Sequence, residues 1–307
     1  MQLIRGLNGL GERQRGCVVT IGTFDGIHLG HQALLGCVAA HARRLGRPSM
    51  VLTFEPMPRE YLAGDDCPAR LTTFRERWQL FATFGVEVLW VLRFDASLRS
   101  LSGEGFARLL AEQLRTPVVV VGHDFRFGRH GEANAEQLCA AGHRLGFQTE
   151  VLPPVMLEGE RVSSSAVRAA LAAGQFGRAT RLLGRPYTIR GRVIGGERLG
   201  RRLGFPTANL ALQRRRSPLE GIFAVRVHGI GAAARPAVAS LGRRPTVDGK
   251  TLLLEVHLFD FSADLYGRQL EVEFVAKLRD EAHFETLEAL VAQMHRDAAA
   301  ARTILEV

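Results

Sequence analysis

The first half of the chain alternates short apolar runs, rich in β-branched residues, with segments whose apolar residues recur at helical spacing. The runs predict strands at residues 17–21, 49–54, 87–94, 117–121 and 148–152. The segments between them predict helices that end near residues 45 and 84 and that span 102–114 and 133–145. Strands that alternate with helices build β-α-β units, so we expect a parallel sheet with helices on both faces.

The pattern changes near residue 185, after two short helical segments that end near residues 171 and 183. Short β-rich runs then follow at residues 187–194, 221–227, 237–241, 252–258 and 269–275. No helical pattern separates these runs, which predicts an antiparallel barrel or sandwich. A last apolar stripe predicts a C-terminal helix that packs against it, with Phe284, Leu287, Leu290, Val291, Met294 and Ala298. We therefore expect two domains, residues 1–184 and 185–307.

The composition is that of a soluble globular protein, with 46% hydrophobic and 23% charged residues. No apolar run has the length of a membrane span or the form of a signal-peptide core, so we expect a cytoplasmic protein without a membrane partner. The four cysteines are widely spaced and form no C-x-x-C pair. That spacing argues against a zinc site and against a disulfide framework.

The net charge of +9 raises the question of nucleic acid, because phosphate neutralisation dominates such binding. Only Lys250 and Lys277 are lysines, so 38 of the 40 basic residues are arginines, and they are spread along the whole chain. The one compact basic run, Arg214 to Arg216, reads as a solvated loop. An anionic small molecule accounts for the charge equally well, and we expect no nucleic-acid partner.

A glycine-rich turn follows the first predicted strand and carries two histidines, His28 and His31, into the next helix. A helix N-terminus has unpaired N–H groups and the positive end of its dipole, which favours a phosphate. Histidines three apart share a helix face. A lone His-x-x-His pair is more often a core or metal-binding pair; its neighbours favour phosphate binding, with Gly22, Phe24, Asp25, Gly26 and Gly30 as further candidates. A P-loop and a dinucleotide-binding Gly-x-Gly-x-x-Gly are both absent here.

Two further segments of the first half could take part in binding. Serines at 163–165, of which Ser164 and Ser165 are site candidates, precede a helix and meet Arg168 one turn in, which suggests a second phosphate site. Taken singly, such serines are ordinary helix caps. The segment 122–128 has two aromatic residues at a strand end and could hold a planar ring, with Asp124, Phe125 and Phe127 as candidates. The alternative is an ordinary turn with buried phenylalanines.

The second half has its own candidate site at 196–209, a glycine-rich block with basic residues that ends in Pro-Thr-Ala-Asn. We expect phosphate binding here rather than a purely structural turn, through Gly200, Arg201, Gly204, Pro206, Thr207 and Asn209. The hydroxyl of Thr207 and the amide oxygen of Asn209 are suited to Mg²⁺ beside a triphosphate. Glu255, in an otherwise apolar strand, could accept a proton from an attacking hydroxyl, although it could also merely face solvent.

Both halves resemble the bacterial bifunctional riboflavin kinase/FAD synthetase family. The first half does so at residues 22–31, 53–56, 122–128 and 162–168, and the second at 200–209, 221–224, 241–246, 255–267 and 278–281. The resemblance implies a Rossmann-like nucleotidyltransferase domain followed by an antiparallel β-barrel kinase domain. It also implies phosphorylation of riboflavin to FMN and then adenylyl transfer from ATP to FMN, which yields FAD and pyrophosphate, with Mg²⁺.

By the same resemblance, Thr207 and Asn209 serve Mg²⁺ and ATP, and Glu255 is the general base for the ribityl 5′-hydroxyl. Riboflavin, FMN and ATP are then the partners, and we expect a monomer or a weak homo-oligomer. A chain with one working activity is the nearer alternative, because Met57 stands where the family has histidine. A flavin or nucleotide sensor, or a basic RNA-binding module, is the more distant one.

Overall fold

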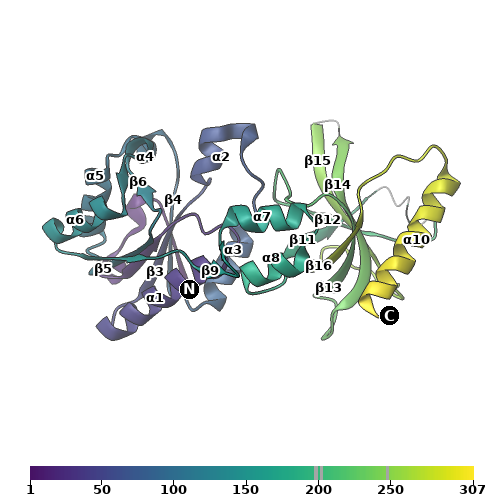
Figure 1. Ribbon diagram of the computed structural model, residues 1–307, viewed down its shortest axis with the longest axis horizontal. Coiled ribbons are helices and arrows are strands. Elements are labelled where there is room, and N and C mark those ends of the chain that lie inside the picture. Colours follow the sequence, from purple (N-terminus) through teal and green to yellow (C-terminus); the bar gives the residue numbers. More distant parts are fainter. Residues whose placement is uncertain (197–199, 201–202, 247–248) are drawn as a thin grey trace. The chain divides into compact units, whose positions relative to one another are not determined.

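The computed structural model describes residues 1–196, 200, 203–246 and 249–307. It contains two compact units (Figure 1). The first consists of Met1–Pro68 and Phe74–Ser163, and the second of Ala69–Thr73 and Ser164–Val307. The units therefore divide earlier than the change of pattern near residue 185, because two helices join the second unit. A division of the activities at residue 184 stays a prediction.

The first unit is built on a parallel sheet, as predicted, but the sheet has six strands rather than five, because β1 (Gln2–Arg5) was not predicted. In spatial order its strands are β1 (Gln2–Arg5), β4 (Val88–Leu92), β3 (Ser49–Phe54), β2 (Val18–Ile21), β5 (Val118–Gly122) and β8 (Gln148–Leu152). The chain runs from β2 to β3 and β4 on one side and places β5 and β8 on the other. Ligands of such sheets bind at the carboxyl ends of the strands where the order reverses, which here is the end of β2 and β5.

Helices cover both faces of this sheet. They are α1 (Leu29–Leu45), α3 (Phe74–Thr83), α5 (Gly103–Arg108), its π-helical continuation η4 (Leu109–Gln113), and α6 (Ala135–Leu145). Successive strand residues point to opposite faces, so β2 contributes Val18 to the core under α1 and Val19 to the core under α5 and α6. The strands and these helices agree with the predicted pattern, apart from the change to π-helix within the segment 102–114.

Several short elements of the first unit were not predicted. They are β1, α2 (Pro58–Ala63), α4 (Ala96–Ser100), and the strand pairs β6 (Arg126–Phe127) with β7 (Ala133–Asn134) and β9 (Met156–Leu157) with β10 (Glu160–Arg161). Single turns of 3-10 helix occur at Leu7–Gly9, Glu12–Gln14, Gly64–Asp66 and Arg129–Gly131. Elements this short have too few residues to show a hydrophobic period.

The second unit is a closed antiparallel barrel rather than a sandwich, because β11 pairs with both β12 and β16. The spatial order is β11 (Thr188–Ile194), β12 (Ala208–Ala211), β15 (Gly249–Leu258), β14 (Arg235–Thr246), β13 (Gly221–His228) and β16 (Gln269–Arg279). β12 was not predicted, since it lies directly after the glycine-rich block. The helices α7 (Ser164–Ala172) and α8 (Phe176–Leu183) precede the barrel.

The C-terminal helix α10 (Leu287–Leu305) packs on the barrel through Ala301 and Leu305, which contact Ala224 and Phe259. The predicted stripe was wrong at Leu287, which is exposed, because the first turns of the helix stand away from the barrel core. Leu290 and Met294 instead line a cavity.

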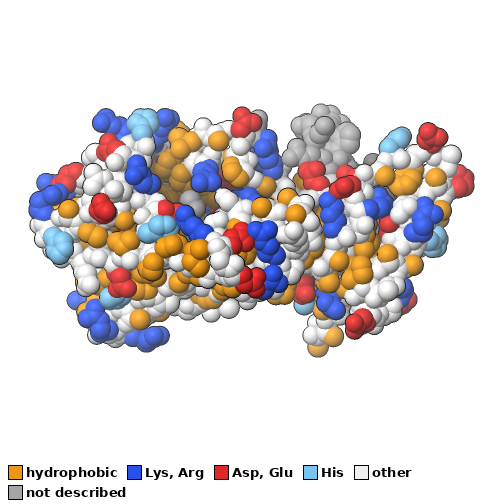
Figure 2. Space-filling view, viewed as in Figure 1, with side chains coloured by type: hydrophobic (Ala, Val, Ile, Leu, Met, Phe, Trp, Pro, Cys, Tyr) orange, Lys and Arg blue, Asp and Glu red, His pale blue; other side chains and the backbone are white. Residues whose placement is uncertain are grey.

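Basic side chains are interspersed with acidic and apolar ones on the face shown in Figure 2, in keeping with the spread of arginines along the sequence. Within the part of the chain that the structure describes, no helix is both long and apolar enough to cross a membrane.

Candidate active sites

The turn between β2 and α1 brings the two predicted histidines together. His28 caps α1: its Nδ1 accepts a hydrogen bond from the His31 backbone N–H at 3.4 Å. The two imidazole rings stack, with their centroids 3.7 Å apart and their planes 18° apart. Because Nδ1 of His28 is an acceptor, a neutral His28 has its proton on Nε2. The sequence predicted two histidines on one face at the start of this 17-residue helix; the stacking of their rings was not predicted.

His31 is a neutral imidazole in this setting. Burial lowers its pKa well below the usual range, and the nearby charges of His28 and Arg77 lower it further. Its Nδ1 is buried and has no hydrogen-bond partner among the described residues. Buried polar atoms are nearly always paired, so a polar group of a ligand would satisfy this nitrogen.

Two of the other predicted residues of this turn, Phe24 and Gly30, pack against the histidines. The ring of Phe24 is fully buried; it lies 5.0 Å from the ring of His31 and edge-on to Phe81. Asp25 is buried. At Gly30 a Cβ atom would lie 3.2 Å from the ring of His28, so a larger residue would displace that imidazole. Gly22 and Gly26 belong to the same turn, and a direct contact of any of these residues with phosphate stays a prediction.

Arg77 is a residue of this region that the sequence did not single out. It lies on α3 with no exposed surface. Its Nη1 donates to the carbonyl oxygen of Thr23 at 2.7 Å and to Oγ1 of Thr53 at 3.3 Å, and its Nη2 donates to Oε2 of Glu55 at 2.6 Å. It therefore joins α3 to the turn after β2 and to the end of β3. A signal was present, because Arg77 interrupts the apolar helical stripe of Phe74, Trp78 and Phe81.

An Arg77→Met variant should unfold the first unit at lower urea concentration. Removal of one partner of a buried ion pair costs about 3–5 kcal/mol. The side chain of Glu55 is 29% exposed, so we expect a loss near the lower end, about 3 kcal/mol. Tryptophan fluorescence reports this unit alone, since both tryptophans of the chain, Trp78 and Trp90, belong to it. Arg75→Met is the matched control, because Arg75 is exposed on the same helix. Equal urea midpoints for the two variants would contradict the structural role of Arg77.

The predicted ring-binding segment after β5 is partly used by the core. Phe125 and Phe127 stack with centroids 5.4 Å apart, but Phe127 is buried against Phe106. Asp124 is exposed and pairs with Arg161. Partial burial acts to raise the pKa of the Asp124 carboxyl, but the hydrogen bond and charge of Arg161 outweigh it and hold that pKa below its usual range. Contact of these residues with a flavin stays a prediction.

The predicted second phosphate site begins α7, in the second unit. Ser164 and Ser165 are the first residues of that helix, and Arg168 follows one turn later. Nε of Arg168 donates to the carbonyl oxygen of Ala69 at 2.6 Å, which fixes the guanidinium against the segment Ala69–Thr73. A role for these three residues in ATP binding stays a prediction.

The barrel carries a cavity of about 770 Å³ that unites the predicted residues of the second half. Gly200, Thr207, Asn209 and Glu255 line it. Asn209 on β12 lies opposite Glu255 on β15, and Glu255 in turn lies opposite Ser240 on β14. Glu255 thus faces the cavity rather than open solvent. Pro206 and Gly204 adjoin this wall without lining it, and Arg201 lies outside the described residues.

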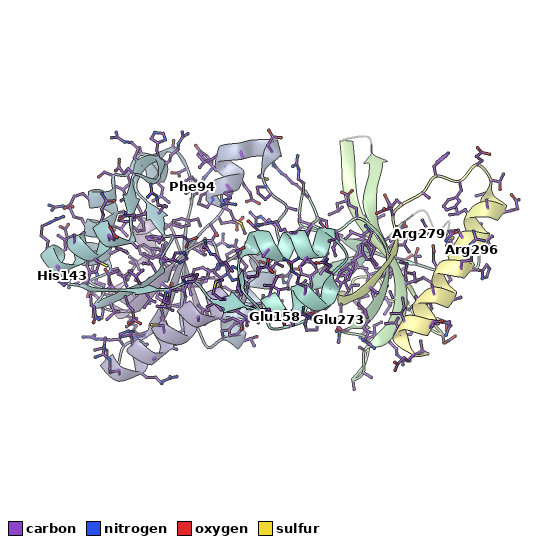
Figure 3. All side chains as sticks on the ribbon, viewed as in Figure 1. Phe94, His143, Glu158, Glu273, Arg279 and Arg296 are labelled. Carbon is purple, nitrogen blue, oxygen red and sulfur yellow. The ribbon has the colours of Figure 1, made fainter. Side chains whose placement is uncertain are left out.

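The remaining walls of the cavity come from the end of β16, the segment after it and α10. The ring of Phe205 contacts two imidazoles: its centroid is 5.0 Å from that of His257 and 4.8 Å from that of His295. Arg279, labelled in Figure 3, donates to the carboxylate of Asp297 from Nε, at 3.0 and 3.1 Å from its two oxygens, and from Nη2 at 2.7 Å. This pair, which was not predicted, joins β16 to α10. The only sequence signal was an acidic residue that precedes a run of four alanines in the C-terminal helix.

Comparisons with known proteins agree on both halves. A family model for FAD synthetase matches residues 10–166, and one for riboflavin kinase matches residues 183–305. The bifunctional riboflavin kinase/FMN adenylyltransferase of Escherichia coli strain K12 is 45% identical over 304 residues, which cover 98% of this chain and 97% of that protein. Its counterpart from Pseudomonas fluorescens is 48% identical over 307 residues, 99% of this chain and 98% of that one.

The chain belongs to the bifunctional riboflavin kinase/FMN adenylyltransferase family. It is a bifunctional riboflavin kinase/FMN adenylyltransferase: ATP phosphorylates riboflavin to FMN and then adenylylates FMN to FAD, with release of pyrophosphate. The resemblance found in the sequence motifs is thereby confirmed. So is the predicted fold class, a parallel α/β unit followed by an antiparallel barrel with a C-terminal helix.

A solved structure described as a macrolide-efflux protein from Streptococcus pneumoniae has the same fold. It superposes with a TM-score of 0.83 at 32% identity and covers 98% of this chain and 99% of that one. That description is of the streptococcal protein. The superposition shows that nearly the whole length of this chain shares its fold with a solved protein.

A Gly200→Ala variant should impair the kinase and spare the adenylyltransferase. A Cβ atom at Gly200 would lie 2.3 Å from the carbonyl oxygen of Phe205 and 3.3 Å from Oγ1 of Thr207. The backbone must then shift, and a displacement of about 1 Å at a binding group can cost about a hundredfold in rate. Riboflavin phosphorylation measured at saturating ATP checks this. Gly231→Ala, in the same unit but with open space around its Cβ, should keep the native rate.

Proposed function

We propose that the cavity beside β12 and β15 is where riboflavin is phosphorylated and that the turn between β2 and α1 binds ATP for adenylyl transfer to FMN. One observation carries the assignment for the kinase: the hydroxyl of Thr207, the amide of Asn209 and the carboxylate of Glu255 all line one cavity. Glu255 is distant in sequence from Thr207 and Asn209, and a purely structural role would not require these three side chains to meet.

In the proposed kinase step, Glu255 accepts the proton of the ribityl 5′-hydroxyl. The hydroxyl oxygen forms a bond to the γ-phosphorus of ATP as the bond from that phosphorus to the bridging oxygen breaks, and ADP leaves. A carboxylate that lines a cavity and lies beside a neutral amide is well placed to act as a base. Positioning and charge stabilisation supply most of the catalysis of phosphoryl transfer.

Magnesium fits the donor set of this cavity. A hydroxyl, an amide oxygen and a carboxylate are hard oxygen ligands, which Mg²⁺ prefers. Thr207 and Asn209 would hold the ion. When bound, Mg²⁺ would neutralise part of the charge on the phosphates.

In the proposed adenylyl transfer, a phosphate oxygen of FMN attacks the α-phosphorus of ATP, and the bond to the bridging oxygen of the leaving pyrophosphate breaks. His28, His31 and the positive N-terminal end of α1 would stabilise the charge on the phosphates, which is how preorganised donors accelerate such reactions. The neutral, unsatisfied ring of His31 supports this role. We assign the glycine-rich turn and Ser164, Ser165 and Arg168 to ATP, and Asp124, Phe125 and Phe127 to FMN.

The same proposal covers the residue ranges of the two activities and the binding partners. The adenylyltransferase would comprise residues 1–184 and the kinase residues 185–307; the two family matches leave residues 167–182 to neither. Its partners would be riboflavin, FMN and ATP, without nucleic acid, and the chain would be a monomer or a weak homo-oligomer. The cytoplasmic location stays a prediction.

Separating flavins after incubation tests the proposal in two arms. Riboflavin with ATP and Mg²⁺ should yield FMN and then FAD, and omission of Mg²⁺ should stop both. FMN with ATP and Mg²⁺ tests the first half alone. Formation of FMN from riboflavin in the first arm, with no FAD in either arm, would favour the alternative of a single activity. Met57, which is buried beside Glu55 and Pro56, is the structural reason for that alternative. Recovery of unchanged riboflavin would refute the kinase assignment.

A further inference from the structure

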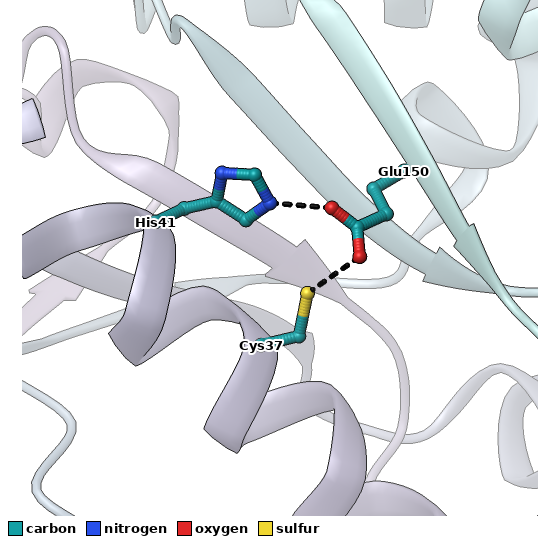
Figure 4. Close-up of side chains that lie close together, drawn as sticks. All are labelled: Cys37, His41 and Glu150. Atoms are coloured by element: carbon teal, nitrogen blue, oxygen red, sulfur yellow. Dashed lines mark hydrogen bonds and ion pairs between the residues drawn. The ribbon is translucent and has the colours of Figure 1, made fainter. Parts of the chain in front are cut away.

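Three side chains with metal-binding atoms meet on the first unit, away from the histidines of the β2–α1 turn. Cys37 and His41 are one turn apart on α1, and Glu150 lies on the edge strand β8 (Figure 4). Sγ of Cys37 is 3.1 Å from Oε1 of Glu150, and Nε2 of His41 contacts Oε2 of the same carboxylate. The sulfur, nitrogen and oxygen ligand atoms all lie within 4.8 Å of one another. Cys37 follows His28 by nine residues, about 13 Å along the helix.

We propose that Cys37, His41 and Glu150 bind one Zn²⁺ ion. Thiolate, imidazole and carboxylate are the ligands that zinc takes in proteins, and three of them with a water molecule complete a tetrahedron. Tetrahedral zinc at its usual bond lengths needs ligand atoms about 3.6 Å apart. The three atoms are close enough to reach this separation by small side-chain rotations, since none lies beyond 4.8 Å from another.

The surroundings of the cluster suit a divalent cation. A thiolate and a carboxylate together balance the two positive charges of the ion. The side chain of His41 is 13% exposed and that of Glu150 39% exposed, so an ion can enter from solvent while most of its shell is protein. Without metal, burial and then the hydrogen bond to Glu150 raise the pKa of the Cys37 thiol to about 12, which makes a role as a nucleophile unfavourable.

Binding would exchange protons for the metal. The Cys37 thiol gives its proton to solvent as the sulfur–zinc bond forms. His41 binds through Nε2 and keeps its proton on Nδ1, which now lies 2.9 Å from Nη2 of Arg44. Arg44 is exposed and can turn into solvent. The ion would then join the second half of α1 to the edge of the sheet.

The wide spacing of the cysteines predicted no zinc site, but that prediction considered only pairs of cysteines. The third ligand here is separated from Cys37 by 113 residues and becomes a neighbour only when β8 joins the sheet. The proposal does not depend on either enzymatic activity.

Zinc titration of the full-length, untagged chain tests the proposal. Protein stripped of metal by EDTA dialysis is titrated with Zn²⁺ in competition with a zinc-binding dye, and we expect one ion per chain. Cys37→Ala and Glu150→Gln should each weaken binding by more than about a hundredfold, since even partners outside the ligand shell cost ten- to hundredfold. Co²⁺ in place of Zn²⁺ should give a thiolate charge-transfer band that Cys37→Ala abolishes.

The chain offers a matched control on α6. Cys139 and His143 have the same spacing on a helix but belong to no such group of three among the described residues. Cys139→Ala should therefore keep both the zinc affinity and the cobalt band. Native tryptophan fluorescence shows whether each variant has folded, and Glu150→Gln decides if Cys37→Ala does not fold. Failure of the native chain to compete with the dye, or equal zinc affinity in all variants, would overturn the proposal.

Discussion

Riboflavin phosphorylation by a Glu255→Gln variant is expected to fall by about 10²–10⁴-fold in kcat, the usual contribution of a general base. Glutamine keeps the size of the side chain and its place opposite Asn209 but cannot accept a proton as a carboxylate does. The KM for riboflavin should change much less than kcat, because the lost group acts on the reacting hydroxyl. Adenylylation of added FMN should keep its native rate, since the site proposed for it does not include the barrel cavity that Glu255 lines. Steady-state rates of FMN and FAD formation, measured separately, check both statements.

A matched control for this experiment is Glu271→Gln. Glu271 lies on barrel strand β16, outside the cavity, and forms an ion pair with Arg190 at 2.6 Å. Ion pairs at a protein surface contribute little to stability, so this variant should remain an active kinase. An equal loss of riboflavin phosphorylation in both variants, or a loss of FAD formation from added FMN in Glu255→Gln, would show that Glu255 acts on stability rather than on catalysis.

The second large effect is expected for His31→Ala. Adenylyl transfer from ATP to FMN should fall by about 10²–10³-fold, as for the loss of one preorganised donor, while riboflavin phosphorylation continues. The variant removes the ring that stacks on His28 and packs on Phe24, and with it the unsatisfied Nδ1 atom. Formation of FAD from FMN and ATP, followed by flavin separation, provides the measurement.

Two further variants separate chemistry from packing in this turn. His31→Asn keeps a polar side chain in place of the ring, and tryptophan fluorescence in urea reports whether either variant unfolds more easily. His143→Ala is the control, because that histidine is exposed on α6 in the same unit, as Figure 3 shows. If His31→Ala lowered both activities together, the proposal of separate sites would be wrong.

Much of the fold could be predicted from local pattern. The strands β3 and β8 begin and end at the predicted residues, and the helix after the glycine-rich turn ends at Leu45 as expected. These elements are long enough to show their period. β12 was missed because its four residues follow a glycine-rich block, and η4 because one π-helical turn in continuation of α5 is too short to change the helical apolar pattern. The choice between barrel and sandwich needed the pairing of β11 with β16, which no local pattern encodes.

The site residues likewise divide into those that the sequence pattern revealed and those that it did not. Thr207, Asn209 and Glu255 were recognisable from their chemistry and from the motifs around them. Their meeting depends on register: side chains alternate along a strand, so a slip of one residue would turn Glu255 away from the cavity. Arg77 and the pair Arg279–Asp297 were not recognised, because the burial of a charge is visible only once the strands and helices around it are packed.

The sequence by itself therefore determined the class of each half, the order of the elements, the two motif sets and the family. These follow from short-range periodicity and from residues close together in the chain. Only the tertiary structure decided which side chains face one another: Glu255 with Asn209, Arg77 with Glu55, and Cys37 with His41 and Glu150. The physical reason is that such contacts are set by strand register and by the packing of helices on a sheet, which join residues far apart in sequence.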